Sequence, residues 1–226
     1  MPQLTCEFLE FSRAAITAAA LADDSQFSLG DGSTDGDAIV QADGRRDVKA
    51  VRSSNDRLSD ASLATFARWR NLYGVYLWNT AVTGVGFSRL EKHQHLVQVS
   101  LLGPNVNDDG VRAVSRLPHV THLQVGNAYD TRDCKYHVHH AIVSDRALLA
   151  VASMANLAYL TIDNAAITDE GIQELASMKS VQSIQFFRCK GLTHNGLERL
   201  RVALPRVRIS AHVPDLATVN PEAGCR

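Results

Sequence analysis

The chain has 226 residues, of which 45% are hydrophobic and 21% charged, with a formal net charge of −1 at pH 7. This size and composition suit one sizeable domain with a buried core. The near-zero charge gives no general indication of nucleic-acid or anionic-membrane binding. No apolar run approaches the roughly 18 residues of a membrane-spanning helix.

The N-terminus, MPQLTCEFLEFSR, lacks the basic and apolar blocks of a secretion signal, so we expect a cytoplasmic protein. Scattered cysteines in such a chain are more often reduced than paired. The pattern predicts a helix over residues 4–22 that either caps the domain, which we prefer, or docks elsewhere. Its apolar side comprises Leu4, Phe8, Phe11 and Ala15.

Residues 1–37 are interpreted as this helix followed by an Asp/Gly-rich linker. Within the linker, DGSTDGD has the spacing of calcium ligands, but Ala42 occupies the position that requires a bidentate glutamate. A flexible linker is therefore preferred to a calcium loop. Residues 38–51, AIVQADGRRDVKAV, are predicted to form two strands around an Asp-Gly turn, as a hairpin that covers the following repeats.

From about residue 48 to residue 210 the sequence repeats with a period of 24, extended once to 37. Three columns of the repeat, eighteen positions in all, contain no polar residue. The columns are Leu58, Val82, Val106, Val143, Ile167, Leu192; Leu63, Phe87, Val111, Leu148, Ile172, Leu197; and Phe66, Leu90, Val114, Val151, Leu175, Leu200. Such spacing predicts stacked units that share one core.

Each unit is expected to be a short strand, a turn and a capped helix. Period-2 alternation such as Val75-x-Leu77 marks the strands, and residues that cap helix N-termini follow the first column. The caps are Ser59, Thr83, Asn107, Ser144, Thr168 and Thr193. The residue before the second column is always small, as a close helix contact would require: Ser62, Gly86, Gly110, Ala147, Gly171 and Gly196.

The units NLAYLTIDNAAITDEGIQELASMK and SVQSIQFFRCKGLTHNGLERLRVA resemble leucine-rich repeats. They are most similar to the cysteine-containing, ribonuclease-inhibitor-like subclass, and Cys189 stands at the cysteine of that pattern. The resemblance covers roughly residues 48–210 and implies an α/β solenoid of about six to seven repeats. With the predicted hairpin as its N-terminal cap, the solenoid domain is expected to span residues 38–210. The resemblance also implies parallel strands on a concave face, helices on the convex face, and protein binding. Residues 211–226 are expected to form an irregular tail.

The 13 extra residues place an inserted loop at 129–141, after a strand and at the rim of the concave face. Inserted loops often carry function. We prefer a polar recognition loop; the alternative is a zinc site. Cys134, His137, His139 and His140 supply sulfur and nitrogen ligands, although their spacing matches no strong zinc signature.

Paired acids occur at Asn107-Asp108-Asp109 and Thr168-Asp169-Glu170, where they fit helix starts better than catalysis. The chain shows no Gly-rich phosphate loop and no recognisable nucleophile set, so no enzyme activity and no cofactor are expected. The first 47 residues also lack the Leu-Pro opening of an F-box.

The concave face is expected to bind a protein partner, because aromatic groups stand among polar ones at outward strand positions. The alternative is that another part of the chain or a second copy covers them. We therefore predict a monomeric, non-enzymatic adaptor that contacts neither nucleic acid nor membrane. Its partner-binding residues are predicted to be Tyr76, Trp78, Leu102, His122, Gln124, Tyr159, Asp163, Gln185, Phe187 and Arg208.

Overall fold

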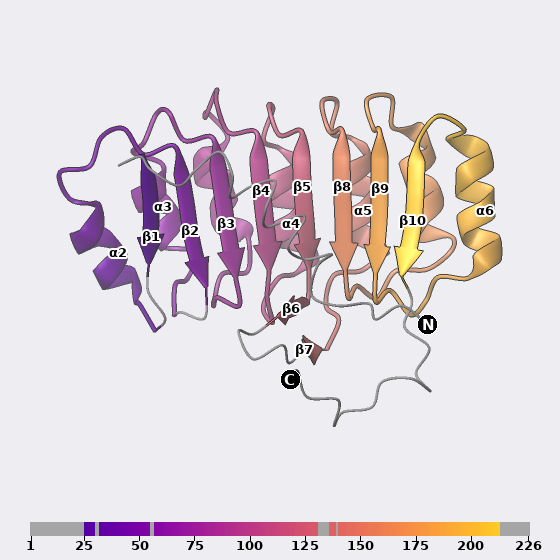
Figure 1. Ribbon diagram of the computed structural model, residues 1–226, viewed down its shortest axis with the longest axis horizontal. Helices are drawn as coiled ribbons and strands as arrows, with labels where there is room; N and C mark the ends of the chain where they lie inside the picture. Colours follow the sequence, from indigo (N-terminus) through magenta and orange to yellow (C-terminus); the bar gives the residue numbers. More distant parts are fainter. Residues whose placement is uncertain (1–24, 30–31, 55–56, 131–135, 139, 213–226) are drawn as a thin grey trace, which may run out of the picture.

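The computed structural model describes residues 25–29, 32–54, 57–130, 136–138 and 140–212. Eight parallel strands form one open sheet in the order β1-β2-β3-β4-β5-β8-β9-β10 (Figure 1). Their bounds are β1 Gln26–Leu29, β2 Ala50–Ser54, β3 Gly74–Trp78, β4 Gln98–Leu102, β5 His122–Gly126, β8 Tyr159–Asp163, β9 Ser183–Phe187 and β10 Arg208–His212. The predicted N-terminal helix lies outside the described residues.

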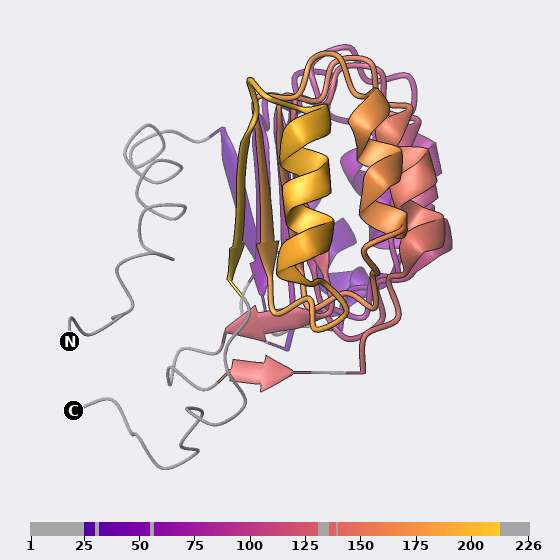
Figure 2. The same ribbon diagram turned by 90° about the vertical axis from the view of Figure 1, so that its right-hand side faces the viewer.

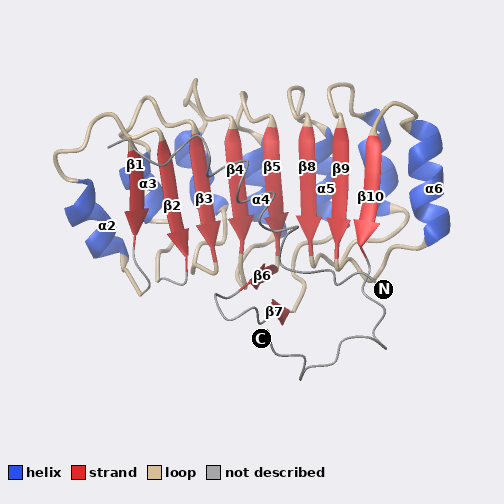
Figure 3. Ribbon diagram, in the orientation of Figure 1, coloured by secondary structure: helices blue, strands red, loops and turns tan. Residues whose placement is uncertain are grey.

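Helical segments alternate with these strands along the chain (Figure 3) and pack on one side of the sheet (Figure 2). Five are α-helices: α2 Asp35–Ala42, α3 Ser62–Phe66, α4 Asp108–Ser115, α5 Asp145–Ala152 and α6 His194–Ala203. Two are 3-10 helices, η1 Val85–Leu90 and η2 Gly171–Ser177. Within the described residues, none of the helices is long and apolar enough to cross a membrane. The predicted α/β class with a parallel sheet is confirmed.

The strand register follows the period found in the sequence. Ala50 pairs with Gly74, Gly74 with Gln98 and Gln98 with His122, each 24 positions along, and the inserted unit pairs His122 with Tyr159. All eighteen apolar column positions are buried between the sheet and the helices. The pattern therefore predicted the core correctly, because only apolar groups can fill that space without losing hydrogen bonds to water.

The helix starts carry a ladder of side-chain hydrogen bonds between units. All six predicted cap residues accept a hydrogen bond from a backbone N–H two or three positions on. Three of them, Asn107, Ser144 and Thr193, are the N-caps of α4, α5 and α6. The prediction is wrong for the other three, because α3, η1 and η2 begin after Ala61, Gly84 and Glu170. In addition, the aspartate after a cap accepts hydrogen bonds from the next unit. Asp145 accepts from the backbone N–H and hydroxyl of Thr168, both at 2.8 Å. Asp35, Asp60, Asp108 and Asp169 make the equivalent bonds to Ser59, Thr83, Ser144 and Thr193.

Small residues are required where helices approach neighbouring units. A Cβ on Gly110 would lie 2.0 Å from the carbonyl oxygen of Thr83, and one on Gly196 would lie 2.0 Å from Asp169 Oδ1. Neither separation is possible between non-bonded atoms. The predicted reason for the small column is therefore confirmed at these positions.

The predicted N-terminal hairpin at 38–51 is wrong, and so is the linker that was expected to run to residue 37. Residues 26–29 form β1, which pairs in parallel with β2, and α2 begins at Asp35. Thr34 caps α2 in a capping box with Asp37. Ile39 and Val40 resemble strand residues but are exposed, whereas Ala38 and Ala42, one helical turn apart, face the core.

The Asp-Gly pair that suggested a hairpin turn instead ends α2. Asp43 is the C-terminal cap residue and Gly44 has φ 75°, the left-handed conformation that commonly terminates helices. Two aspartates of the stretch with calcium-ligand spacing likewise make hydrogen bonds within the fold. Asp37 belongs to the capping box, and Asp35 accepts hydrogen bonds from Ser59 and Ser62.

At the other end, the repeat pattern aligns Arg206 with Ser183, but the observed register of the last strand is shifted by two residues. Arg208 pairs with Ser183 and Ser210 with Gln185, a spacing of 25 rather than the assumed 23. A two-residue slip keeps every side chain on the same face, so alternation alone could not detect it. The strand continues to His212, two residues into the predicted tail, and residues 213–226 lie outside the described part.

Candidate functional site on the open face of the sheet

The sheet has one face covered by helices and one that no described helix covers (Figure 2). We call the latter the open face. Alternate strand residues point to it, and all ten predicted partner-binding residues belong to this outward set. It comprises positions 26 and 28 of β1 and the first, third and fifth residue of each later strand.

Tyr76 and Leu102 are less accessible than their positions predicted. Tyr76 is 4% exposed and Leu102 is 8% exposed. The Arg52 guanidinium lies 4.6 Å from the centre of the Tyr76 ring, and the Tyr76 hydroxyl donates a hydrogen bond to Gln98 Oε1. Burial raises the pKa of Tyr76, partly offset by the positive charge of Arg52. These contacts make Tyr76 part of the scaffold of the face rather than a free anchor.

Trp78 is half-buried and is held by a chain of hydrogen bonds across three strands. Its Nε1 donates to Ser100 Oγ at 2.7 Å, and that hydroxyl donates to Gln124 Oε1 at 2.9 Å. The rings of Trp78 and Tyr76 are 6.4 Å apart and tilted by 56°. Trp78 is thus fixed in orientation while part of its ring stays accessible, which favours binding at low entropic cost.

In the middle of the face, His122 and Tyr159 form a stacked pair. Their ring centres are 4.4 Å apart and their planes differ by 19°. His122 Nδ1 lies 2.8 Å from Thr121 Oγ1, and burial lowers the pKa of His122. Tyr159 is 36% exposed, and its hydroxyl donates to Gln182 Oε1 at 3.0 Å. The pair presents a flat aromatic surface with polar edges.

Asp163 lies on the face but is already paired. It is 4% exposed and accepts a hydrogen bond from Arg188 Nε at 2.9 Å, with a second from the same guanidinium. Burial raises the pKa of Asp163, and the positive charge of Arg188 counteracts that rise. Arg188 follows β9 in a left-handed conformation, φ 53°, and the sequence pattern gave no signal for it. The carboxylate is therefore neutralised within the face.

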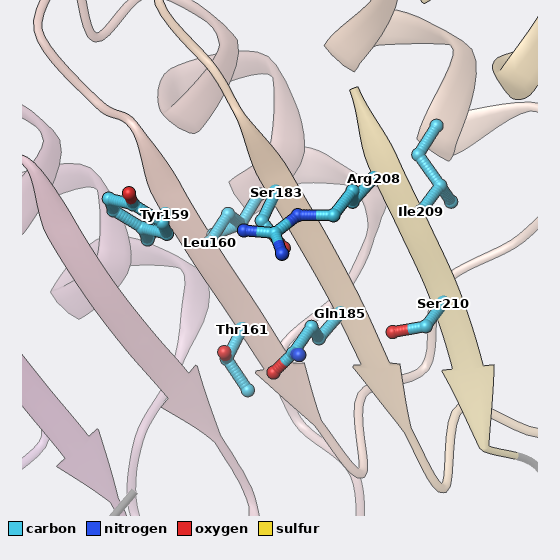
Figure 4. Close-up of a pocket in the computed structure, with 8 residues that line it drawn as sticks. All are labelled: Tyr159, Leu160, Thr161, Ser183, Gln185, Arg208, Ile209 and Ser210. Atoms are coloured by element: carbon cyan, nitrogen blue, oxygen red, sulfur yellow. The ribbon is translucent and has the colours of Figure 1, made fainter. Parts of the chain in front are cut away.

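Beyond this pair, Phe187 is half-buried beside Asp163, and a cavity opens towards β10. It is lined by Tyr159, Leu160, Thr161, Ser183, Gln185, Arg208, Ile209 and Ser210 (Figure 4). Three predicted binding residues, Tyr159, Gln185 and Arg208, line this cavity. Ser183 and Ser210 were not singled out, because small polar residues on a strand carry no distinctive signal.

The inserted loop leaves the carboxyl end of β5, as predicted, and includes an antiparallel pair, β6 Ala128–Asp130 and β7 Tyr136–Val138 (Figure 1). Asn127 fixes both ends of the insert. Its fully buried side chain donates to the carbonyls of Gly103 and Val106, at 3.1 and 2.7 Å. Its Oδ1 accepts from the N–H groups of Ile142 and Val143, at 2.8 and 2.9 Å. Sequence reasoning missed this residue.

The zinc alternative stays a prediction. Cys134 and His139 lie outside the described residues, and of His137 only the backbone is described, within β7. His140 is exposed. In the rest of the described chain, no three His, Cys, Asp or Glu residues cluster closely enough to hold a metal ion.

Comparison with protein-family models and with curated proteins finds no match for this chain.

Proposed function

We propose that the protein is a non-enzymatic leucine-rich-repeat module that binds a protein partner on the open face of its sheet. The family assignment is supported by the 24-residue strand spacing and by the place of Cys189. This buried thiol lies 3.3 Å from the carbonyl oxygen of Phe187, and burial raises its pKa to about 12. A thiol of that kind packs within the turn and stays unreactive.

The observation that carries the proposal is the composition of the uncovered face. Trp78, Tyr159 and Phe187 remain partly accessible on one rigid sheet, surrounded by hydroxyl and amide groups. Aromatic anchors within a polar surround are typical of binding hot spots. The two acid pairs considered for catalysis favour the same conclusion, because Asp108 and Asp169 are used in the hydrogen-bond ladder between units.

The proposal is tested by site-specific photo-crosslinking in lysate from the source cells. A photoreactive phenylalanine analogue replaces Gln185 on the open face in one protein and Leu149 on α5 in a matched protein. Leu149 is 63% exposed on the opposite side. We expect a partner that crosslinks in stoichiometric amounts from position 185 and not from position 149. Equal crosslinking from both positions, or none from position 185, would contradict the proposal.

A further inference from the structure

A shallow cavity that is open to solvent lies at the β10 end of the open face. Its volume is about 480 Å³, within the roughly 300–1,000 Å³ typical of ligand pockets. Hydroxyl groups from three strands and the amide of Gln185 line it, and the ring of Tyr159 forms one side (Figure 4). Room exists for a few amino-acid side chains from a bound segment.

Arg208 supplies the charge of this cavity. Its side chain extends from β10 across β9 towards Tyr159 (Figure 4). Arg208 is exposed, and no carboxylate of the described residues forms an ion pair with its guanidinium. Asp163 is the single acidic residue among the outward positions of the described sheet strands, and Arg188 neutralises it.

The positive charge of Arg208 is therefore not balanced by an acidic residue at the outward positions of the described strands, although the whole chain has a net charge of −1. Arg52, at the far end, lies over the Tyr76 ring, so Arg208 is the cation aimed into a cavity. A guanidinium binds a carboxylate through two parallel hydrogen bonds. The hydroxyls of Ser183 and Thr161 and the Gln185 amide can satisfy further oxygen lone pairs.

We propose that this cavity binds the carboxylate side chain of an Asp or Glu residue in the protein partner. The inference rests on the proposed function and names the chemistry of that partner: an acidic segment whose neighbouring apolar group packs on Tyr159. A single arginine matches the single charge of a carboxylate. A phosphate dianion would favour a site with several cations.

The first test is selection from a phage-displayed library of random 12-residue peptides. Three baits are used: wild type, Arg208→Glu, and Arg206→Glu as the matched control. Arg206 is exposed two residues away and lies outside the cavity lining. We expect Asp and Glu to be enriched by wild type and by the control, and not by Arg208→Glu. A wild-type selection without acidic enrichment, or its equal loss in the control, overturns the inference.

The second test measures coupling between the two charges. The best selected peptide and a version with its enriched acid changed to the amide are titrated against wild type and Arg208→Gln by fluorescence anisotropy. We expect the amide to weaken wild-type binding by about tenfold and to change little in the variant. Equal effects on both proteins overturn the inference.

Failure of the carboxylate subsite can be distinguished from failure of the proposed protein binding. A partner that crosslinks from position 185 and binds Arg208→Gln as tightly as wild type removes the carboxylate subsite and leaves protein binding standing. Failure of the position-185 crosslink removes the protein-binding proposal itself.

Discussion

The two faces of the sheet follow different rules. On the helix side, each unit presents the same residue type at the same place, as at Leu63, Phe87 and Val111, and all of these are buried. On the open face, the first outward position changes in every unit: Gly74, Gln98, His122, Tyr159, Ser183 and Arg208. Repetition is needed where units must stack on identical neighbours. Variation is tolerated where no neighbour imposes a shape, and specific recognition becomes possible there.

The open face itself contains two groups of residues, one buried and one accessible. Tyr76, Leu102 and Asp163 are buried and so belong with the scaffold. Trp78, Tyr159, Phe187 and Arg208 retain accessible surface. A variant of the first group should lose stability, and a variant of the second group should lose binding.

The largest expected effect comes from the buried clamp of the insert. Asn127→Ala removes the partner of the Ile142 and Val143 N–H groups and of the Val106 carbonyl, whereas the Gly103 carbonyl still accepts from the Val106 N–H at 3.4 Å. We expect a loss of about 3–5 kcal/mol in the free energy of unfolding. Gln124→Ala on the open face removes one acceptor near water and should cost under about 1 kcal/mol. Urea unfolding measures both. Equal losses would remove the distinction between scaffold and face.

Two glycine-to-alanine substitutions are expected to change the stability of the protein in opposite directions. Gly110→Ala would place a Cβ 2.0 Å from the Thr83 carbonyl oxygen, and the required backbone shift should cost about 2 kcal/mol. Gly36→Ala, in α2, would meet only Thr34 Oγ1 at 3.5 Å, so helix propensity should stabilise it by about 0.5 kcal/mol. Thermal unfolding monitored by circular dichroism checks the two signs. Stabilisation by Gly110→Ala would contradict the close packing.

The aspartate ladder predicts a smaller effect that depends on pH. Hydrogen bonds from the Thr193 hydroxyl and N–H, its largest causes, lower the pKa of Asp169 below 3.8. Because this folded-state pKa is depressed, the stability contributed by the carboxylate is present above the unfolded value. It is lost as the pH falls through the folded one.

Asp169→Asn should therefore lower stability at pH 7 and lose that effect as the pH falls through the depressed folded-state pKa, with a total under about 1 kcal/mol because the group is only partly buried. Glu170→Gln is the control, since among the described residues that carboxylate pairs only with Arg199, at 3.8 Å. Urea unfolding across this pH range measures both variants. A pH-independent loss in Asp169→Asn would contradict the ladder.

The smallest expected signal is the zinc content of the protein, which tests the inserted loop at 129–141. We expect purified, untagged protein to retain no stoichiometric zinc, as elemental analysis would show. Zinc that is retained, and that is lost on changing Cys134 and His137 to Ala, would instead establish the metal site.

The sequence predicted the core and strand spacing well because burial leaves a periodic apolar signal. It failed at α2, where alanines rather than large residues face the core, and at β10, where a two-residue slip preserves alternation. The sequence pattern could not predict which side chains of the open face are exposed, for another reason. Alternation tells which way Tyr76 points, but its burial depends on Arg52 and Gln98, which come from strands 24 and 22 residues away.

Affinity for the crosslinked partner, measured by isothermal titration calorimetry, tests the central claim most directly. Trp78→Ala/Tyr159→Ala/Phe187→Ala alters the open face, and Val40→Ala/Leu149→Ala/Val202→Ala removes exposed apolar groups from the helix side. With both variants shown to be folded, we predict a loss of at least about a hundredfold for the first and under about threefold for the second. Equal losses, or a larger loss for the helix-side variant, would contradict the account.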